Sequence, residues 1–194
     1  WNVLADCYAH RSAEVGDNGP IVWKNRSQLI AKCLRECNTD VLCLQEVDHF
    51  EDFYKKCLTN LGYRPCFVQR PERQDGCLIA FKNDKFELVD LVQVSCDDAI
   101  SADSLYEYQK YVKHNVALIV QLKDRATQKE VMISTCHVHW NPMLPEVKMS
   151  QIAHILQKLN EFRDGDLPVV LTGDFNTLPS DPIYAAITTT SAPN

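Results

Sequence analysis

A carboxylate and an amide lie two residues apart near the end of the chain, in the run Thr172-Gly173-Asp174-Phe175-Asn176. The carboxylate of Asp174 can hold a water molecule or a metal ion, and the amide of Asn176 can donate a hydrogen bond to a phosphate oxygen. Because side chains alternate along a strand, residues at this spacing point to the same side. An Asx turn that only closes the strand is the structural alternative, since these residue types are frequent in turns.

The residues before this pair are apolar. Residues 167–171 read Leu-Pro-Val-Val-Leu without polar alternation, which is typical of a strand buried on both faces. Gly173 lacks a side chain at the point where another group must approach the backbone. The pattern therefore predicts a buried strand that delivers Asp174 and Asn176 to its carboxyl end.

Three further polar residues, Asn2, Glu46 and His137, lie in or at the ends of other predicted strands. Glu46 can ligate Mg²⁺, which prefers oxygen, and Asp174 can orient or deprotonate an attacking water. An amide and a histidine can stabilise charge on phosphoryl oxygens. Each residue alone is explained as well by a structural role. Together they suit hydrolysis of a phosphate ester, whereas no G-x-S-x-G or Cys–His signature supports acyl transfer.

The elements that must position these residues alternate in the first third of the chain. We predict strands at residues 1–6 and 40–47 and helices at residues 25–37 and 48–62, the second with a capping box formed by Asp48 and Glu51. After residue 62, apolar runs between turn signals predict antiparallel strands at 63–68, 77–81, 86–94, 115–122 and 131–140.

Helical spacing returns at residues 146–162, with Leu156 expected on the inward face and Lys148, Gln151 and His154 on the solvated face. Residues 96–111 are polar and are expected to form a loop or an irregular helix, and a short helix is expected at 180–187. No repeat or linker interrupts the chain, so we predict one α/β domain over residues 1–194.

Composition narrows the class of protein. The net charge of −6 argues against a protein that coats duplex nucleic acid by charge alone, and it is compatible with an acidic site that recruits a divalent cation. No apolar run approaches the roughly 20 residues that span a bilayer, and no signal peptide opens the chain. We therefore expect a soluble protein without a membrane partner.

The nine cysteines include no C-x-x-C pair. Cys33 and Cys37 lie four residues apart on a predicted helix and do not form the two close pairs of a zinc site, so we predict no zinc. We expect reduced thiols in the core of a cytoplasmic protein, with the nucleus or an organelle as alternatives. The cysteines in apolar segments are Cys33, Cys37, Cys43, Cys57, Cys77 and Cys136.

Five stretches together resemble the endonuclease/exonuclease/phosphatase superfamily, and within it the branch of carbon catabolite repressor-type deadenylases, nocturnin and angel proteins. That resemblance implies a four-layer α/β sandwich of two packed mixed, mainly antiparallel sheets flanked by helices. It also implies cleavage of a phosphodiester with Mg²⁺ as cofactor and Mn²⁺ as the alternative. The stretches are Trp-Asn-Val-Leu-Ala-Asp (1–6), Leu-Gln-Glu-Val (44–47), Asp-Gly-Cys (75–77), Cys-His-Val-His-Trp-Asn-Pro (136–142) and Thr-Gly-Asp-Phe-Asn-Thr-Leu-Pro (172–179).

The resemblance assigns roles to five residues. Glu46 resembles the metal-binding glutamate of the family, and Asn2 resembles the asparagine beside the metal and phosphate. Asp174 resembles the catalytic residue that positions or activates the water. His137 and Asn176 resemble the residues that stabilise and hold the phosphate.

Two further substrate-binding candidates are Pro142 and Asn115. Pro142 resembles a proline on which deadenylases rest the terminal adenine, although a loop proline beside Trp140 is an equal alternative. His139 is expected to be structural. Asn115 lies at the start of a predicted strand.

The resemblance is incomplete at the C-terminus. The family pattern continues with another catalytic aspartate and a Ser-Asp-His segment, and neither follows Asn176 here. We therefore expect these 194 residues alone to have little activity, since loss of a catalytic histidine commonly lowers the rate by orders of magnitude. Measurable Mg²⁺-dependent poly(A) shortening by this chain alone would contradict that expectation.

The residues around Trp140 and the following helix resemble the deadenylase pattern more than the nocturnin pattern. The implied function is that of a 3′-to-5′ exoribonuclease that shortens poly(A) tails, with a single-stranded RNA 3′ end as substrate and adaptor proteins of a deadenylase complex as possible partners. An unpaired base can stack and present its edges, which fits this substrate. The alternatives are hydrolysis of a nucleotide cofactor, a cyclic phosphate end or 2′,5′-oligoadenylate, and a catalytically silent domain that binds RNA or protein.

Overall fold

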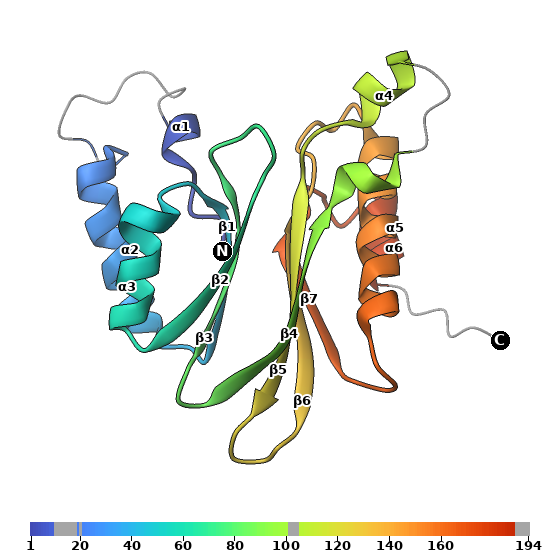
Figure 1. The fold of residues 1–194 in the computed structure, drawn as a ribbon. Coiled ribbons are helices and arrows are strands. Elements are labelled where there is room, and N and C mark those ends of the chain that lie inside the picture. The colour runs from blue at the N-terminus through green and yellow to red at the C-terminus, as the bar shows by residue number, and fades with distance from the viewer. Residues whose placement is uncertain (10–18, 20, 101–104, 189–194) are drawn as a thin grey trace.

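Two β-sheets pack face to face between two layers of helices in the structure, a computed structural model that describes residues 1–9, 19, 21–100 and 105–188, with Glu107 described by its backbone alone (Figure 1). The first sheet has the order β1-β3-β2 and the second has the order β4-β5-β6-β7. The strands are β1 (Val41–Val47), β2 (Tyr63–Gln69), β3 (Gly76–Lys82), β4 (Phe86–Ser95), β5 (Val116–Asp124), β6 (Glu130–His137) and β7 (Val169–Asp174).

Neighbouring strands are antiparallel except that β7 runs parallel to β6, and Asn2 adds an isolated parallel bridge to Gln45 of β1. α2 and α3 cover the outer face of the first sheet, and α5 and α6 lie outside the second (Figure 1). This arrangement confirms the predicted α/β sandwich. The helical segments are α1 (Asp6–Ala9), α2 (Trp23–Cys37), the π-helical turn η1 (Phe50–Tyr54), α3 (Lys55–Asn60), the 3₁₀ turn η2 (Cys96–Ala99), α4 (Leu105–Tyr111), α5 (Pro145–Phe162) and α6 (Pro182–Thr188).

Three apolar clusters lie between these layers, because successive strand residues point to opposite faces. Leu118 of β5 belongs to the cluster between the sheets, and its neighbour Ile119 belongs to the cluster under α5. Ile30 and Leu34 of α2 pack on the opposite face of the first sheet. Among the described helices, none is long and apolar enough to cross a membrane.

The first six residues do not form the predicted strand. Leu4 has a φ of +60°, which interrupts the extended backbone, and the Leu4 amide donates instead to the side chain of Asn2 at 2.9 Å. α1 then begins at Asp6. The predicted capping box is also wrong, because η1 has no side-chain cap and the carboxylate of Asp48 accepts a hydrogen bond from the Asp6 amide.

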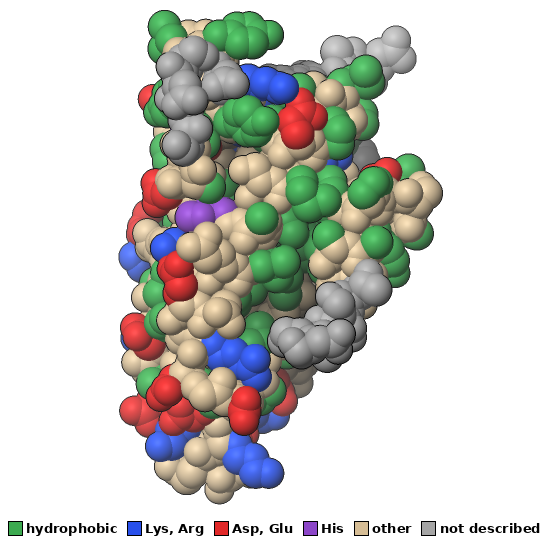
Figure 2. Space-filling view, turned by 90° about the vertical axis from the view of Figure 1, so that its right-hand side faces the viewer, with side chains coloured by type: hydrophobic (Ala, Val, Ile, Leu, Met, Phe, Trp, Pro, Cys, Tyr) green, Lys and Arg blue, Asp and Glu red, His purple; other side chains and the backbone are tan. Residues whose placement is uncertain are grey.

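The face of α5 was predicted wrongly at four residues. Lys148, Gln151 and His154 are buried, whereas Leu156 is exposed. The first two are buried because they bond to groups at the ends of the second sheet, as described below. Figure 2 shows the side of the molecule that carries α5 and α6, where hydrophobic side chains gather in a hollow in the middle of the face.

β7 is not buried on both faces, in contrast to the prediction. It forms one edge of its sheet in the described part of the chain, and Val169 and Val170 are 37% and 47% exposed. An uninterrupted apolar run therefore indicated a strand correctly but not its surroundings.

The cysteines divide by position rather than forming a uniform core. Cys77 and Cys136 are buried as predicted, but Cys33 and Cys37 lie on the exposed face of α2, and Cys43 and Cys57 are half-buried. All nine thiols are free. Residues 96–111 form η2 and α4, which agrees with the predicted irregular helix except that residues 101–104 lie outside the described part.

Candidate active site

The predicted site residues come together where the two sheets meet at the ends of three strands. Glu46 lies near the end of β1, His137 ends β6 and Asp174 ends β7. The side-chain amide of Asn2 donates hydrogen bonds to Glu46 Oε1 at 2.7 Å and to Asp174 Oδ2 at 2.9 Å. Each sheet thus contributes one carboxylate, and Asn2 joins them.

Glu46 is held by a local distortion of its strand. A β-bulge shifts the register of β1 and β3 between Gln45 and Val47, and Glu46 has a φ of +59°. Its Oε2 accepts a hydrogen bond from the Ala5 amide at 3.0 Å. Bulges are frequent beside active sites because they redirect one side chain out of the alternating pattern.

His137 is buried between the two carboxylates. Its Nε2 lies 4.0 Å from Glu46 Oε1 and 3.8 Å from Asp174 Oδ2, which is too far for hydrogen bonds. Its Nδ1 is buried and has no hydrogen-bond partner within the described residues. Both carboxylates of the site therefore lie on the Nε2 side of the imidazole ring.

A chain of buried amides supports His137 from behind. Asn115 Nδ2 donates to the His137 carbonyl at 2.7 Å, and Asn115 Oδ1 accepts from Gln151 Nε2 at 3.0 Å. Gln151 Oε1 then accepts from the His139 amide at 2.9 Å. Both ends of the Asn115 amide are therefore occupied by protein groups, although Asn115 also lines the pocket described below.

Asp174 and Asn176 combine a turn with a site. The Asn176 amide N–H donates to Asp174 Oδ1 at 3.1 Å, which is an Asx turn, while Asp174 Oδ2 faces Asn2. The Asn176 side chain donates to the Val138 carbonyl at 2.9 Å. Lys148 Nζ donates to the Asn176 carbonyl at 2.6 Å and so ties α5 to this turn. The Asx turn is thus confirmed, and the roles predicted for Asp174 and Asn176 in a site stay predictions.

An open pocket of about 610 Å³ borders these groups. Pro142 is exposed in the turn before α5 and does not line the pocket, whereas its neighbour Trp140 does. The role predicted for Pro142 remains a prediction. The lining residues are Leu4, Tyr8, Glu46, Arg70, Arg73, Val112, Lys113, His114, Asn115, His137, Val138, His139, Trp140, Asp174 and Asn176.

Positive charge gathers on one side of this pocket, which the sequence reasoning missed. Burial, and then the charges of Lys113, Arg70 and Lys148, lower the pKa of His139 to about 4. Among the sequence motifs, only Asp-Gly-Cys at 75–77 contains a residue beside these cations, because Asp75 lies next to Arg70. The Tyr8 hydroxyl donates to Asp75 at 2.8 Å, and burial, followed by this bond, raises the pKa of Tyr8 to about 12.

The oxygen-rich groups fit a magnesium ion better than a zinc ion. Within the described residues, no group of three His, Cys, Asp or Glu side chains could hold a metal ion by itself. Glu46 and Asp174 instead offer carboxylate oxygen atoms beside open space, and the Asn2 amide donates to both. Mg²⁺ usually takes one or two carboxylates and keeps several waters.

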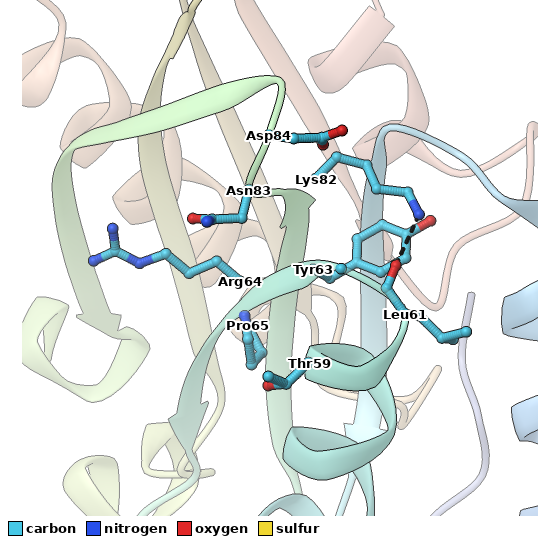
Figure 3. Close-up of a pocket in the computed structure, with 9 residues that line it drawn as sticks. Thr59, Leu61, Tyr63, Arg64, Pro65, Lys82, Asn83 and Asp84 are labelled. Carbon is cyan, nitrogen blue, oxygen red and sulfur yellow. Dashed lines mark hydrogen bonds between the residues drawn. The ribbon is translucent and has the colours of Figure 1, made fainter.

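A second pocket, of about 580 Å³, lies at the other end of the first sheet (Figure 3). Lys82 crosses it, donates to the Leu61 carbonyl at 2.9 Å and lies 4.1 Å above the ring of Tyr63. Asp84 is the one carboxylate among its lining residues. This pocket lacks paired acids and a histidine, so the catalytic chemistry belongs to the first pocket.

The family model for the Endonuclease/Exonuclease/phosphatase family matches residues 1–192. The chain belongs to the endonuclease/exonuclease/phosphatase family. It lies in the branch of that family that contains carbon catabolite repressor 4, angel and nocturnin proteins. The resemblance seen in the sequence is thereby confirmed.

Two curated relatives in this family cover nearly all of the chain. Carbon catabolite repressor protein 4 homolog 4 of Arabidopsis thaliana is 29% identical over 231 residues, which cover 99% of this chain and 55% of the relative. The CCR4-Not complex 3′-5′-exoribonuclease subunit Ccr4 of Phaeosphaeria nodorum is 26% identical over 250 residues, which cover 97% and 42%. The chain thus spans about half the length of the curated relatives it matches.

The family fold is also found in the crystal structure of ANGEL2, described as a 2′,3′-cyclic phosphatase, in complex with adenosine-2′,3′-vanadate. The TM-score is 0.83 at 28% sequence identity, and the match covers 96% of this chain and 55% of that chain. The likeness extends over both sheets, because nearly the whole chain is matched.

Proposed function

We propose that the protein hydrolyses phosphodiesters with Mg²⁺ and acts as a 3′-to-5′ exoribonuclease on single-stranded RNA, with poly(A) as its preferred substrate. The observation that supports this proposal is the joining of Glu46 and Asp174 by Asn2, beside His137, at an open pocket. Groups of this kind match the needs of phosphate ester hydrolysis, which are an activated water and stabilised charge on the phosphoryl oxygens.

The division of labour follows from the contacts. Asp174 Oδ2, which also accepts a hydrogen bond from Asn2, orients a water molecule and takes its proton, while the Asn176 amide N–H fixes the other oxygen of this carboxylate. His137 donates from Nε2 to a phosphoryl oxygen, since this nitrogen is the one that faces the two carboxylates of the site. Glu46, with Asn2 and Asp174 beside it, would hold a Mg²⁺ ion, which when bound neutralises charge on the phosphate.

An RNA end is supported by the relatives and by the charge of the pocket. The Ccr4 relative is named as a 3′-5′-exoribonuclease subunit of the CCR4-Not complex. Here, Arg70, Arg73 and Lys113 line the same pocket in a protein whose net charge is −6. A polyanionic strand would be attracted to this pocket rather than to the surface at large.

Substrate profiling of the full-length protein tests this proposal. With Mg²⁺, we expect 5′-labelled poly(A) to be shortened from its 3′ end faster than poly(U) or poly(C), and the Asp174→Asn protein to be inactive. Circular dichroism of the variant should match the wild type, since the Asn side chain fills the same space. Equal rates for all homopolymers would refute the poly(A) preference, and an active variant would refute the role of Asp174.

A second candidate is removal of 2′,3′-cyclic phosphate ends, which is favoured by the likeness to the ANGEL2 structure with adenosine-2′,3′-vanadate. An oligoadenylate that ends in a cyclic phosphate separates the two reactions. The exonuclease releases mononucleotides and shortens the strand, whereas the phosphatase changes the end group and leaves the length unchanged. Mass spectrometry of the products distinguishes these outcomes.

A further inference from the structure

Two cations beside the candidate site have no partner that explains their position. The guanidinium group of Arg73 makes no hydrogen bond or ion pair with any residue that the structure describes, although Arg73 lines the pocket. The ammonium group of Lys113 donates to the Gln109 carbonyl at 3.2 Å and, among the described residues, has no carboxylate partner.

From this arrangement, we propose that Arg73 and Lys113 form a second phosphate subsite in the pocket, and that Trp140 is the stacking platform for an unpaired base of the same strand. The ligand class is a nucleic-acid end with at least two phosphates, rather than a phosphomonoester or a small diester. This inference rests on the proposed function, because it extends the strand away from the phosphate that would be cleaved.

The backbone segments that carry the two cations are tied together by buried groups. Arg70 Nε and Nη2 donate to the carbonyls of His114 and Lys113, both at 2.9 Å, and Arg70 Nη1 lies 3.3 Å from Asp75 Oδ2. The carboxylate of Asp97 accepts hydrogen bonds from the amides of Lys113 and His114 at 3.1 to 3.2 Å. Arg70 therefore ties the β2–β3 turn, which contains Arg73, to the segment that contains Lys113. With the backbone of both segments fixed, only the two side chains need ordering when a ligand binds.

The charges reach into the pocket. Lys113 and Arg70 are among the causes that hold the pKa of His139 low, and His139 lines the same pocket. Arg70 is already neutralised by Asp75, which is almost fully buried, so it acts as a positioning residue. Arg73 and Lys113 remain to meet a polyanion. The acids Glu46 and Asp174 line the same pocket.

Trp140 supplies the apolar surface. Its side chain is 68% exposed although it lines the pocket, and Leu4, another lining residue, is 41% exposed. A large exposed indole beside cations is the combination on which single-stranded nucleic acids stack. The pocket volume of about 610 Å³ lies within the range for ligands much larger than one phosphate group.

Binding measurements test the subsite independently of catalysis. The probe is a 5′-fluorescein-labelled oligoadenylate, followed by anisotropy with the full-length protein in EDTA at several salt concentrations. Arg73→Gln and Lys113→Gln should each weaken binding about tenfold and reduce the slope of log K against log salt by about 0.7, the value for one phosphate contact on a single strand. Trp140→Ala should weaken binding about tenfold, and Trp140→Phe should retain most of it.

Lys129→Gln is the matched control. Lys129 is exposed at the β5–β6 turn and does not line the pocket, and its substitution removes the same charge. Its affinity and salt slope should equal those of the wild type. A slope that falls equally in the Lys129 and Arg73 variants would overturn the subsite, as would unchanged affinity in the Arg73 and Lys113 variants. Weakening by Trp140→Phe as large as that by Trp140→Ala would overturn the stacking platform.

Turnover separates this inference from the proposed function. In the Arg73 and Lys113 variants, kcat/KM for oligoadenylate should fall at least tenfold more than kcat/KM for bis(p-nitrophenyl) phosphate, which has one phosphate and no base. Equal losses on the two substrates would contradict a second phosphate subsite. A wild-type protein that cleaves neither substrate would refute the proposed function, and the binding measurements would still decide on the subsite.

Discussion

Asn2 is the residue that links the acids of the two sheets. Its side-chain amide donates to Glu46 Oε1 and to Asp174 Oδ2, and its Oδ1 accepts from the Leu4 amide. Two carboxylates that approach one another repel, and shared hydrogen bonds from one amide group offset part of that repulsion. The position of each acid therefore depends on a residue that is not itself acidic.

We predict that Asn2→Ala lowers kcat about 10- to 100-fold, the usual effect of removing a group that orients such ligands. The fold should be retained because Asn2 is half-buried at the edge of the structure. Asn2→Asp should be at least as harmful, since it adds a third negative charge. Steady-state kinetics with poly(A), alongside thermal unfolding of both variants, measures the effect, and a fully active Asn2→Ala protein would contradict it.

His139 provides a prediction about pH. Its pKa is about 4 in the folded protein and 6.5 at its ordinary value, so between these pH values the unfolded chain binds a proton that the folded chain does not. Stability then rises with pH across this window and is lost as the pH falls. We expect the free energy of unfolding to drop less from pH 7 to pH 5 in His139→Gln than in the wild type. Urea titrations at both pH values measure this, and equal drops would count against the assignment.

Residue types predicted which residues form the site better than they predicted the backbone distortions and hydrogen bonds that hold them. Asp174, Glu46 and His137 follow visible strand patterns, so their convergence could be expected from the sequence. The bulge at Glu46 and the left-handed φ of Leu4 left no local signal, because both depend on contacts with distant segments. For the same reason, the gathering of Arg70, Arg73 and Lys113 at the pocket was not predicted.

At the scale of elements, polar residues of α5 were misplaced where their side chains reach groups beyond the ends of the strands that the helix covers. Lys148 and Gln151 read as the solvated side of α5, yet they are buried because they bond to Asn176 and Asn115. Helical periodicity separates polar from apolar residues, but it does not reveal which polar residues have a buried partner. β7 shows the converse, since an apolar run there is partly exposed.

The contact between β6 and β7 depends on Gly173. A Cβ atom at this position would lie 2.5 Å from the Cys136 carbonyl oxygen and 2.7 Å from its Sγ, and the residue has a φ of +154°. We predict that Gly173→Ala destabilises the protein by about 1–3 kcal/mol, the usual range for overpacking, and displaces Asp174. Urea unfolding measures the stability, and the activity should fall with it.

Gly62→Ala is the control for this change. Gly62 has a φ of +83°, but a Cβ atom there would meet nothing within 4 Å. Its substitution should therefore cost about 1–2 kcal/mol from backbone conformation, without loss of activity. If the two variants lost stability equally and both remained active, close approach at Gly173 would not be the cause.

At the scale of the molecule, the two sheets are joined by a polar contact inside an apolar interface. Gln45 Nε2 of β1 donates to Thr135 Oγ1 of β6 at 2.8 Å, and both residues are buried. This bond lies one residue from Glu46 on the first sheet and two residues from His137 on the second. It therefore fixes the distance between the two halves of the site.

We predict that Gln45→Leu lowers the free energy of unfolding by about 1–3 kcal/mol, because it leaves the hydroxyl of Thr135 unpaired. Thr135→Val should do the same to the amide of Gln45. The double variant should lose less than the sum, with a coupling of about 0.5–3 kcal/mol. Urea unfolding of all four proteins completes the cycle, and strict additivity would show that the bond contributes nothing.

The two sheets are also consecutive in the sequence. All strands of the first lie between Val41 and Lys82, all strands of the second lie between Phe86 and Asp174, and the exposed turn at residues 83–85 joins them. A break in an exposed turn is usually tolerated. The protein is thus suited to fragment complementation. Two polypeptides divided at this turn would each hold one acid of the pair. Each should be inactive alone, and hydrolysis should return when two interacting proteins fused to them bring the halves together.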